Sequence, residues 1–189
     1  MKWHRTFHCF VLHRRDLWHA ISDNLTLQSI KTKGRAEEII FSGETGPYKR
    51  SQQTVGSAEL IIPEVIDAIK RVFPGCKSIT AKILKSTKGD VPQALHQDYS
   101  PAESPKAIKS LSRYHYSAVI SFDNDTRLII GDKNEEICIP RLSMIFFRGD
   151  MSHAGAGYTK SDVRLFLSIS SDLFPESENV HLVGVSTCN

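Results

Sequence analysis

Two features of the sequence predict a mainly β protein with flanking helices. From residue 78 onwards, turn signals divide the chain into short segments whose apolar residues alternate with polar ones, as in half-buried strands. Before that point, apolar residues recur at helical spacing in two segments, residues 3–23 and 63–73. Many short strands preceded by helices favour a jelly-roll, that is a double-stranded β-helix barrel, over an α/β sheet.

The whole chain of 189 residues is predicted to form one domain, because a chain of this length buries enough surface for a core of its own. Residues 1–77 are expected to supply helical and loop support, residues 78–172 the β-helix core, and residues 173–189 a tail. The 40% hydrophobic and 24% charged content is that of an ordinary globular protein and not of a disordered one.

Charge, cysteine content and hydropathy predict a soluble intracellular protein. A net charge of +3 is too small to indicate nucleic-acid binding by itself, although basic residues outnumber acidic ones in residues 1–50. The four cysteines form no C-x-x-C pair, which is typical of free thiols in a reducing compartment. No apolar run approaches the ~20 residues that span a bilayer. Cytoplasm or nucleus is expected, and organelle import stays open because residues 1–15 contain no acid.

Helix 63–73 has the clearest boundaries in the first half of the chain. Pro63 suits the first helical turn, and Pro74-Gly75 ends the pattern. Its apolar stripe should pack on the sheet. A second amphipathic helix is predicted over residues 3–23, and residues 25–56 are expected to form short strands and loops.

The later strands follow one another with clear turns between them. Residues 100–112 have little apolar patterning and are expected to form either a mobile lid or an inert connection. The last core strand would place Arg164, Phe166, Ser168 and Ser170 on one face. The predicted strands are residues 79–83, 114–122, 127–130, 135–139, 144–147 and 163–170.

A histidine and a carboxylate two residues apart form the first half of a candidate metal site. Because residues i and i+2 of a strand project from the same face, His96 and Asp98 can reach one ion. His153 would supply the third ligand, since a jelly-roll brings distant strands together. Two imidazoles and one carboxylate on one face of an octahedral ion leave open positions, as in non-haem Fe(II) oxygenases. Arg164, 11 positions after His153, would hold the carboxylate of a cosubstrate.

This ordered set of residues resembles the Fe(II)/2-oxoglutarate-dependent oxygenase superfamily, whose pattern is His-x-Asp, a distal His, and Arg or Lys roughly ten residues later. The resemblance covers residues 78–172 and is best in residues 147–158 and 164–168. Those two segments are similar to the prolyl-hydroxylase-like and phytanoyl-CoA-hydroxylase-like branches. The triplet His-Gln-Asp is also found in the phytanoyl-CoA and nucleic-acid-dealkylating branches.

The resemblance implies a dioxygenase in which His96, Asp98 and His153 bind Fe(II) and Arg164 binds 2-oxoglutarate. O2 would be the other cosubstrate, with ascorbate as a further candidate cofactor and with succinate and CO2 as coproducts. Halogenating relatives replace the carboxylate by a small residue, so Asp98 favours hydroxylation or oxidative demethylation.

Further contacts to 2-oxoglutarate are also implied by the resemblance. A polar side chain just before the His-x-Asp often helps to hold the cosubstrate, and Thr87 and Gln93 are the candidates here. Independently of the resemblance, one face of the strand 114–122 is expected to line the site, which makes Tyr116 either a contact of cosubstrate or substrate or a core tyrosine. Many family members have Ser two residues after the Arg, where this chain has Phe166, so Ser168 on the same predicted face would substitute.

Two other classes of protein stay open. A cupin-like metal-binding protein would keep the fold and the ion without turning over 2-oxoglutarate, and Arg164 would then be a structural ion-pair partner. A structural or interaction protein without metal would place His96, Asp98 and His153 far apart. Within the oxygenase class, the substrate is a small molecule, a protein side chain or, in a dealkylating enzyme, a nucleic acid.

Overall fold

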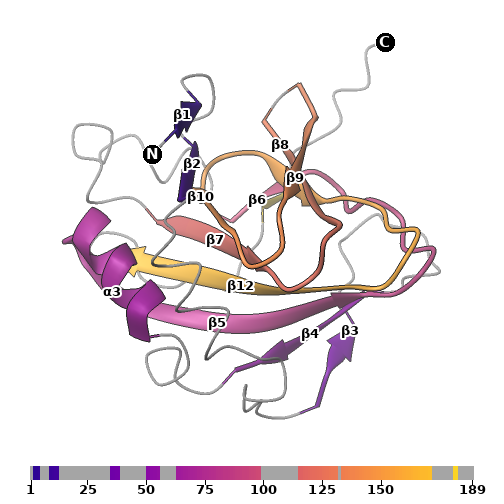
Figure 1. Ribbon diagram of the computed structural model, residues 1–189, viewed down its shortest axis with the longest axis horizontal. Helices are drawn as coiled ribbons and strands as arrows, with labels where there is room; N and C mark the ends of the chain where they lie inside the picture. Colours follow the sequence, from indigo (N-terminus) through magenta and orange to yellow (C-terminus); the bar gives the residue numbers. More distant parts are fainter. Residues whose placement is uncertain are drawn as a thin grey trace.

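Two β-sheets and one helix make up the described part of the protein. The computed structural model describes residues 2–4, 9–12, 35–38, 50–55, 63–98, 115–131, 133–171 and 181–182. Figure 1 shows helix α3 (Pro63–Val72) beside the long strands β5, β7 and β12, with β8 and β9 above them. This arrangement confirms the prediction of a mainly β, jelly-roll fold.

The larger sheet joins strands that are far apart in the sequence. β12 lies at its centre, where it pairs antiparallel with β5 on one side and with β7 on the other. Each of its described pairs is antiparallel. Its strand order is β1 (Lys2–His4), β2 (Cys9–Leu12), β10 (Met144–Arg148), β7 (Tyr116–Ser121), β12 (Asp162–Ser171), β5 (Cys76–Ser86), β4 (Arg50–Thr54) and β3 (Glu37–Glu38).

The smaller sheet lies on the other side of the barrel interior. Its central strand, β11, pairs with β6 on one side and with the hairpin strand β8 on the other. The predicted hairpin is confirmed, because β8 pairs in register with β9. The strand order is β13 (His181–Leu182), β6 (His96–Gln97), β11 (His153–Gly155), β8 (Thr126–Ile130) and β9 (Glu135–Ile139).

Alternation along the strands of the larger sheet separates two apolar cores. On β12, Leu165 and Leu167 face α3, where Val65, Ile66 and Ile69 cover that side of the sheet. The opposite face packs against the smaller sheet. That second core contains Val119, Leu128, Ile130, Ile139, Ile145 and Phe147, with Phe166 against it. The period of two therefore decides which side chains enter the space between the sheets.

Helix α3 forms where the sequence predicts it. Its apolar stripe is buried, and the basic residues Lys70 and Arg71 in its last turn interact favourably with the negative end of the helix dipole. The backbone N–H of Phe73 still donates to the carbonyl of Ile69 at 2.7 Å, after which Pro74 ends the helix.

The predicted helix over residues 3–23 is wrong where the structure describes this segment. Residues 2–4 and 9–12 form strands, and β2 pairs with the edge of β10, with Ile145 opposite Val11. Backbone hydrogen bonds to an otherwise open sheet edge outweigh a helical spacing of apolar residues, and Phe10-Val11 suits a strand. Residues 5–8 and 13–34 lie outside the described residues.

One described strand falls within the residues predicted to form the tail. The predicted tail contributes β13, which pairs with β6 and places Leu182 opposite His96.

Residues 100–112, the lid candidate, lie outside the described residues. No helix in the described ranges is long and apolar enough to cross a membrane.

Replacing Leu167 by Ala should lower the free energy of unfolding by about 2–5 kcal/mol, because the side chain is fully buried between α3 and the sheet. Urea unfolding followed by circular dichroism measures this change, and the denaturant m-value should stay constant. Lys77→Ala is the control, since Lys77 is exposed on β5 and should change stability by less than about 0.5 kcal/mol. Equal effects of the two substitutions would contradict the assigned core.

Candidate metal centre

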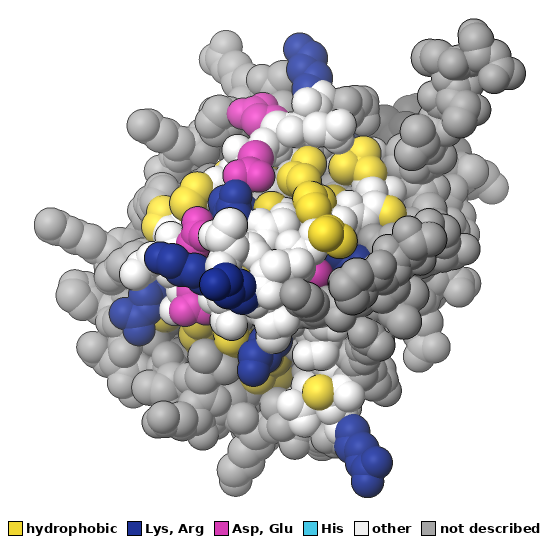
Figure 2. Space-filling model, turned by 90° about the vertical axis from the view of Figure 1, so that its right-hand side faces the viewer, with side chains coloured by type: hydrophobic (Ala, Val, Ile, Leu, Met, Phe, Trp, Pro, Cys, Tyr) yellow, Lys and Arg dark blue, Asp and Glu magenta, His cyan; other side chains and the backbone are white. Residues whose placement is uncertain are grey.

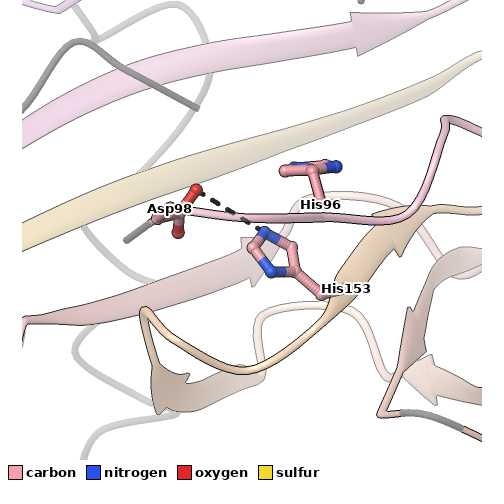
Figure 3. Close-up of side chains that lie close together, drawn as sticks. All are labelled: His96, Asp98 and His153. Atoms are coloured by element: carbon pink, nitrogen blue, oxygen red, sulfur yellow. Dashed lines mark ion pairs between the residues drawn. The ribbon is translucent and has the colours of Figure 1, made fainter. Parts of the chain in front are cut away.

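The three predicted metal ligands lie together in the structure. His96 on β6 is directly opposite His153 on β11, and Asp98 follows β6 immediately. Their candidate ligand atoms all lie within 4.8 Å of one another, and the centres of the two imidazole rings are 4.4 Å apart. Figure 3 shows the side chains converging from two neighbouring segments. This geometry makes a potential metal site from residues 57 positions apart (153 − 96).

Backbone carbonyls orient both imidazole rings. Nδ1 of His96 donates to the carbonyl of Ala94 at 2.8 Å, and Nδ1 of His153 donates to the carbonyl of Met151 at 2.9 Å. Each hydrogen bond fixes the tautomer in which Nε2 is unprotonated. Metal-bound histidines are held in this way by a partner of the second ring nitrogen.

The two oxygens of Asp98 have different partners. Oδ1 lies 3.7 Å from Nε2 of His153, on the side where an ion would bind. Oδ2 accepts a hydrogen bond from the hydroxyl of Ser117 on β7. The neighbouring Gln97 donates from Nε2 to the carbonyl of Asp150 at 2.9 Å, which ties β6 to the turn before His153. The larger sheet therefore orients a ligand that the smaller sheet carries.

Burial keeps His115 and His153 neutral. Removal from water lowers the pKa of His153 to about 4, and only the hydrogen bond to Met151 opposes this shift. Burial likewise lowers the pKa of His115 to about 4, with the nearby Asp98 acting in the opposite direction. Since metal ligation requires a neutral imidazole, His153 is ready to bind an ion at neutral pH.

A cavity of about 120 Å³ lies between the sheets beside the triad. Its walls come from both sheets, so residues from seven strands and from the segments on either side of β6 face the same space. The lining residues are Gln52, Lys82, Leu84, Gln93, His96, Asp98, Val119, Leu128, His153, Gly155, Arg164 and Phe166.

Arg164 lies across this cavity from the triad, on β12. Its side chain is only 4% exposed, and Nη1 donates to Oδ2 of Asp162 at 2.7 Å and to Oγ of Ser86 at 3.3 Å. The guanidinium also lies 5.3 Å from the ring centre of Tyr158, a favourable cation–π distance. These contacts hold one side of the guanidinium, and Nη2 lies on the side of Gly155.

The absence of a side chain at Gly155 makes room for the side chain of Gln93. A Cβ on Gly155 would lie 2.6 Å from Oε1 of Gln93 and 3.2 Å from Nη2 of Arg164. The backbone N–H of Gly155 donates to that Oε1 at 2.7 Å, which fixes the Gln93 amide at the cavity wall. Of the two expected contacts before the His-x-Asp, the structure therefore brings Gln93 to the site, whereas Thr87 is exposed and outside the cavity lining.

The other two expected contacts lie elsewhere. Tyr116 is 2% exposed in the core under α3, where its ring stacks on Phe146 at 4.9 Å, because even-numbered residues of β7 face the helix. Ser168 has the interior orientation that was expected, but its hydroxyl is 2.8 Å from Nε2 of His115 and does not line the cavity. Neither residue is brought to the cavity beside the triad.

Several residues of the site were missed by sequence reasoning. Ser117 and Val119 lie on the opposite face of β7 from Tyr116, and a period of two cannot tell which face of a strand is interior when both faces are buried. Lys82 and Gln52 are polar residues on strands whose alternation was visible only in part. One relation links Lys82 to the site: Lys82 and Leu84 are two residues apart on β5, so they point to the same side of the sheet, and both line the cavity.

Comparisons with known proteins identify similar folds among solved structures but do not assign this chain to a family. No family model matches the sequence, and no curated protein matches it. The three solved structures below are each less than 25% identical to this chain, and the two with a TM-score of 0.50 or more show a likeness of fold alone.

One similar structure is a prolyl hydroxylase from Trichoplax adhaerens in complex with a peptide fragment of the hypoxia inducible factor oxygen degradation domain. It is 9% identical, with a TM-score of 0.59 over 87% of this chain and 84% of that one. A 2OG-Fe(II) oxygenase family oxidoreductase from Burkholderia pseudomallei is 12% identical, with a TM-score of 0.50 over 76% of each chain. A cupin-2 domain from Rhodospirillum rubrum is 10% identical, with a TM-score of 0.46 over 82% of each chain.

The metal-free protein should lose stability as the pH falls from about 6.5 towards about 4. In this window the unfolded chain protonates His115 and His153, whose pKa there is the ordinary 6.5, whereas in the folded protein both pKa values are about 4. Urea unfolding in chelator measures this dependence. His115→Gln should reduce the slope of the free energy of unfolding against pH by at most about 1.4 kcal/mol per pH unit. An unchanged slope in the variant would contradict a neutral, buried His115.

Ser117→Ala should weaken Fe(II) binding by about 10- to 100-fold, because Asp98 loses the hydroxyl that fixes its outer oxygen. Calorimetric titration of Fe(II) without O2 measures the dissociation constant. Ser78→Ala is the matched control, since that hydroxyl bonds to Ser170 and does not line the cavity. If both variants bind Fe(II) as the wild type does, Ser117 has no part in orienting the ligand.

Proposed function

We propose that this protein is an Fe(II)- and 2-oxoglutarate-dependent dioxygenase. The observation that carries the proposal is a cavity with His96, Asp98 and His153 on one side and Arg164 on the other. The reaction hydroxylates or oxidatively demethylates a C–H bond of a substrate, with succinate and CO2 as coproducts. The ligand-binding side chains thus come from both sheets of the barrel.

The donor set fits Fe(II). Two neutral imidazoles and one carboxylate on one face of an octahedral ion suit a divalent iron and leave positions for a chelating cosubstrate and O2. Because Nδ1 of each histidine donates to a backbone carbonyl, Ala94 for His96 and Met151 for His153, Nε2 is the unprotonated nitrogen of each ring. Ser117 donates a hydrogen bond to Oδ2 of Asp98, so Oδ1 is the oxygen that would bind the ion. Each residue therefore presents one atom to a common point.

Arg164 is placed to receive the distal carboxylate of 2-oxoglutarate. A guanidinium is a strong donor to carboxylates, and the Nη2 side of this one adjoins the cavity wall at Gly155. Asp162, Ser86 and the ring of Tyr158 hold the group in place, so little side-chain freedom is lost on binding. Phe166, two residues on, lines the cavity beside it and excludes water from this wall.

When bound, Fe(II) would activate O2 as the oxidant with 2-oxoglutarate as the electron donor, and the chain orients and shields the reactants. Ser117 keeps the ligand carboxylate in one orientation, and burial keeps the imidazole of His153 unprotonated. Val119, Leu128 and Phe166 give the cavity apolar walls between its two polar ends. An apolar wall protects a reactive centre from side reactions with water.

One observation favours a second candidate function. Because Arg164 already has a buried ion-pair partner in Asp162, its charge has a structural reason to be present. A cupin-like metal-dependent protein that never uses 2-oxoglutarate would keep this ion pair and the triad. The two functions differ in whether the metal-loaded protein binds and consumes 2-oxoglutarate.

The substrate class is open among small molecules, protein side chains and nucleic acids. Figure 2 shows one face of the molecule on which the described basic and acidic side chains are interspersed. Binding to a phosphate backbone requires a basic surface. As far as the structure describes this face, it carries no continuous basic surface of that kind.

Succinate formation from 2-oxoglutarate tests the proposal, with protein loaded with Fe(II) anaerobically and then exposed to O2. The wild type should turn over slowly even without a substrate, and His153→Ala should form no succinate because a ligand is lost. Metal binding without binding or decay of 2-oxoglutarate would replace this function by the cupin-like one. Lys133→Ala, exposed and outside the cavity lining, is the control and should match the wild type.

The role of Arg164 needs a variant that leaves no buried charge behind. Removing Arg164 alone would strand Asp162, at a cost of about 3–5 kcal/mol of stability. The double variant Asp162→Asn with Arg164→Gln removes both charges. It should raise the 2-oxoglutarate concentration needed for half-maximal succinate formation by about 10- to 100-fold while Fe(II) affinity stays within about 3-fold. If the double variant needs the same 2-oxoglutarate concentration as the wild type, Arg164 has a structural role only.

A further inference from the structure

Resting on the function proposed above, we infer that Lys82 is a second residue that binds the distal carboxylate of 2-oxoglutarate and makes the site selective for a dicarboxylate. Lys82 lies on β5 and lines the same cavity as Arg164. Neither the triad nor the Arg motif points to it.

The register of the larger sheet places Lys82 beside Arg164. On β12, Arg164 is opposite Leu84 and Phe166 is opposite Lys82. Lys82 and Leu84 are two residues apart on β5 and share a face, so Lys82 is the diagonal neighbour of Arg164. Diagonal neighbours on paired strands have their Cβ atoms about 7–8 Å apart, within reach of two long side chains. One carboxylate can therefore contact both cations.

Arg164 by itself brings no net charge to the cavity. Its Nη1 is 2.7 Å from Oδ2 of Asp162, and the two side chains are 4% and 1% exposed. The other oxygen of Asp162 accepts a hydrogen bond from Thr126, which in turn accepts one from Ser121 at 2.7 Å. This chain of hydrogen bonds keeps the carboxylate next to the guanidinium. The pair is neutral as a unit, so it offers hydrogen bonds to an anion with little net attraction.

Lys82 supplies the charge that this pair lacks. Its side chain is half-buried, and no carboxylate in the described ranges pairs with it. A divalent ion, the carboxylate of Asp98 and the dianion 2-oxoglutarate leave one net negative charge in the cavity. The ammonium of Lys82 cancels it. An uncompensated charge in a partly enclosed, apolar-walled cavity is costly, which is why the cancellation matters for binding.

Two amides complete the distal end of the cavity. Gln52 is opposite Leu84 on the strand β4, and Gln93 is fixed by the N–H of Gly155. Both line the cavity with Lys82 and Arg164. Amide N–H groups donate to carboxylate oxygens without adding charge. A 2-oxo acid that lacks the distal carboxylate would leave the ammonium unpaired, so the site should reject it.

The test measures ligand affinity in the absence of O2, so that it does not depend on turnover. Calorimetry gives the dissociation constants of 2-oxoglutarate and of 2-oxopentanoate, which lacks the distal carboxylate, for the Fe(II)-loaded protein. Lys82→Met keeps the unbranched shape and most of the length of the side chain and removes the charge. It should weaken the binding of 2-oxoglutarate by about 10- to 100-fold, bind 2-oxopentanoate at least as tightly as the wild type does because no ammonium is left unpaired, and leave Fe(II) affinity unchanged.

Two further variants separate charge from structure. Lys82→Arg should keep most of the affinity for 2-oxoglutarate because it keeps the charge. Lys85→Met is the matched control, since Lys85 is exposed on the same strand with the opposite parity, and it should bind both acids as the wild type does. A Lys82→Met variant that binds 2-oxoglutarate as tightly as the wild type would overturn this inference alone. A wild type that binds neither acid would overturn the proposed function, and this inference with it.

Discussion

The pairing of β6 with β11 is the constraint on which the candidate site depends. It sets His96 directly opposite His153, and the residue that follows β6 by one position, Asp98, then reaches the same point. Paired residues on neighbouring strands have fixed Cβ separations, so the backbone hydrogen bonds of the smaller sheet determine the distance between the two imidazoles. A slip of this register by one residue would turn one ring to the other face.

The larger sheet contributes by placing polar groups where the interior is otherwise apolar. Ser117 orients Asp98, and the buried hydrogen bonds from Ser121 through Thr126 and Asp162 hold Arg164. A buried polar group is costly unless it is hydrogen-bonded, so each of these groups restricts its neighbour to one arrangement. The two sheets thus face each other with a ligand set on one and a carboxylate-binding set on the other.

Secondary structure was predicted correctly where the apolar residues had one clear periodicity. It was predicted wrongly where the same spacing of apolar residues suited both a helix and a strand. Helix 63–73, the hairpin at 127–139 and the strand at 163–170 were found because their apolar patterns sit between clear turn signals. Residues 9–12 were wrongly assigned to a helix because their partner strand, β10, lies more than a hundred positions later, and residues 3–4 were wrongly assigned with them because they pair with residues 9–10. Tyr116 stayed open between a site contact and a core residue, because β7 is buried on both faces and alternation then does not tell which face is interior.

The sequence by itself determined the chemistry of the candidate site, because residue type and spacing decide which atoms can bind an ion and which can bind a carboxylate. His96 and Asp98 share a face through the two-residue period, and Arg164 follows His153 along the chain. Only the tertiary structure decided which further side chains reach the cavity. Lys82, Gln93 and Ser117 are brought there by strand pairing across long separations, and no local pattern contains that pairing.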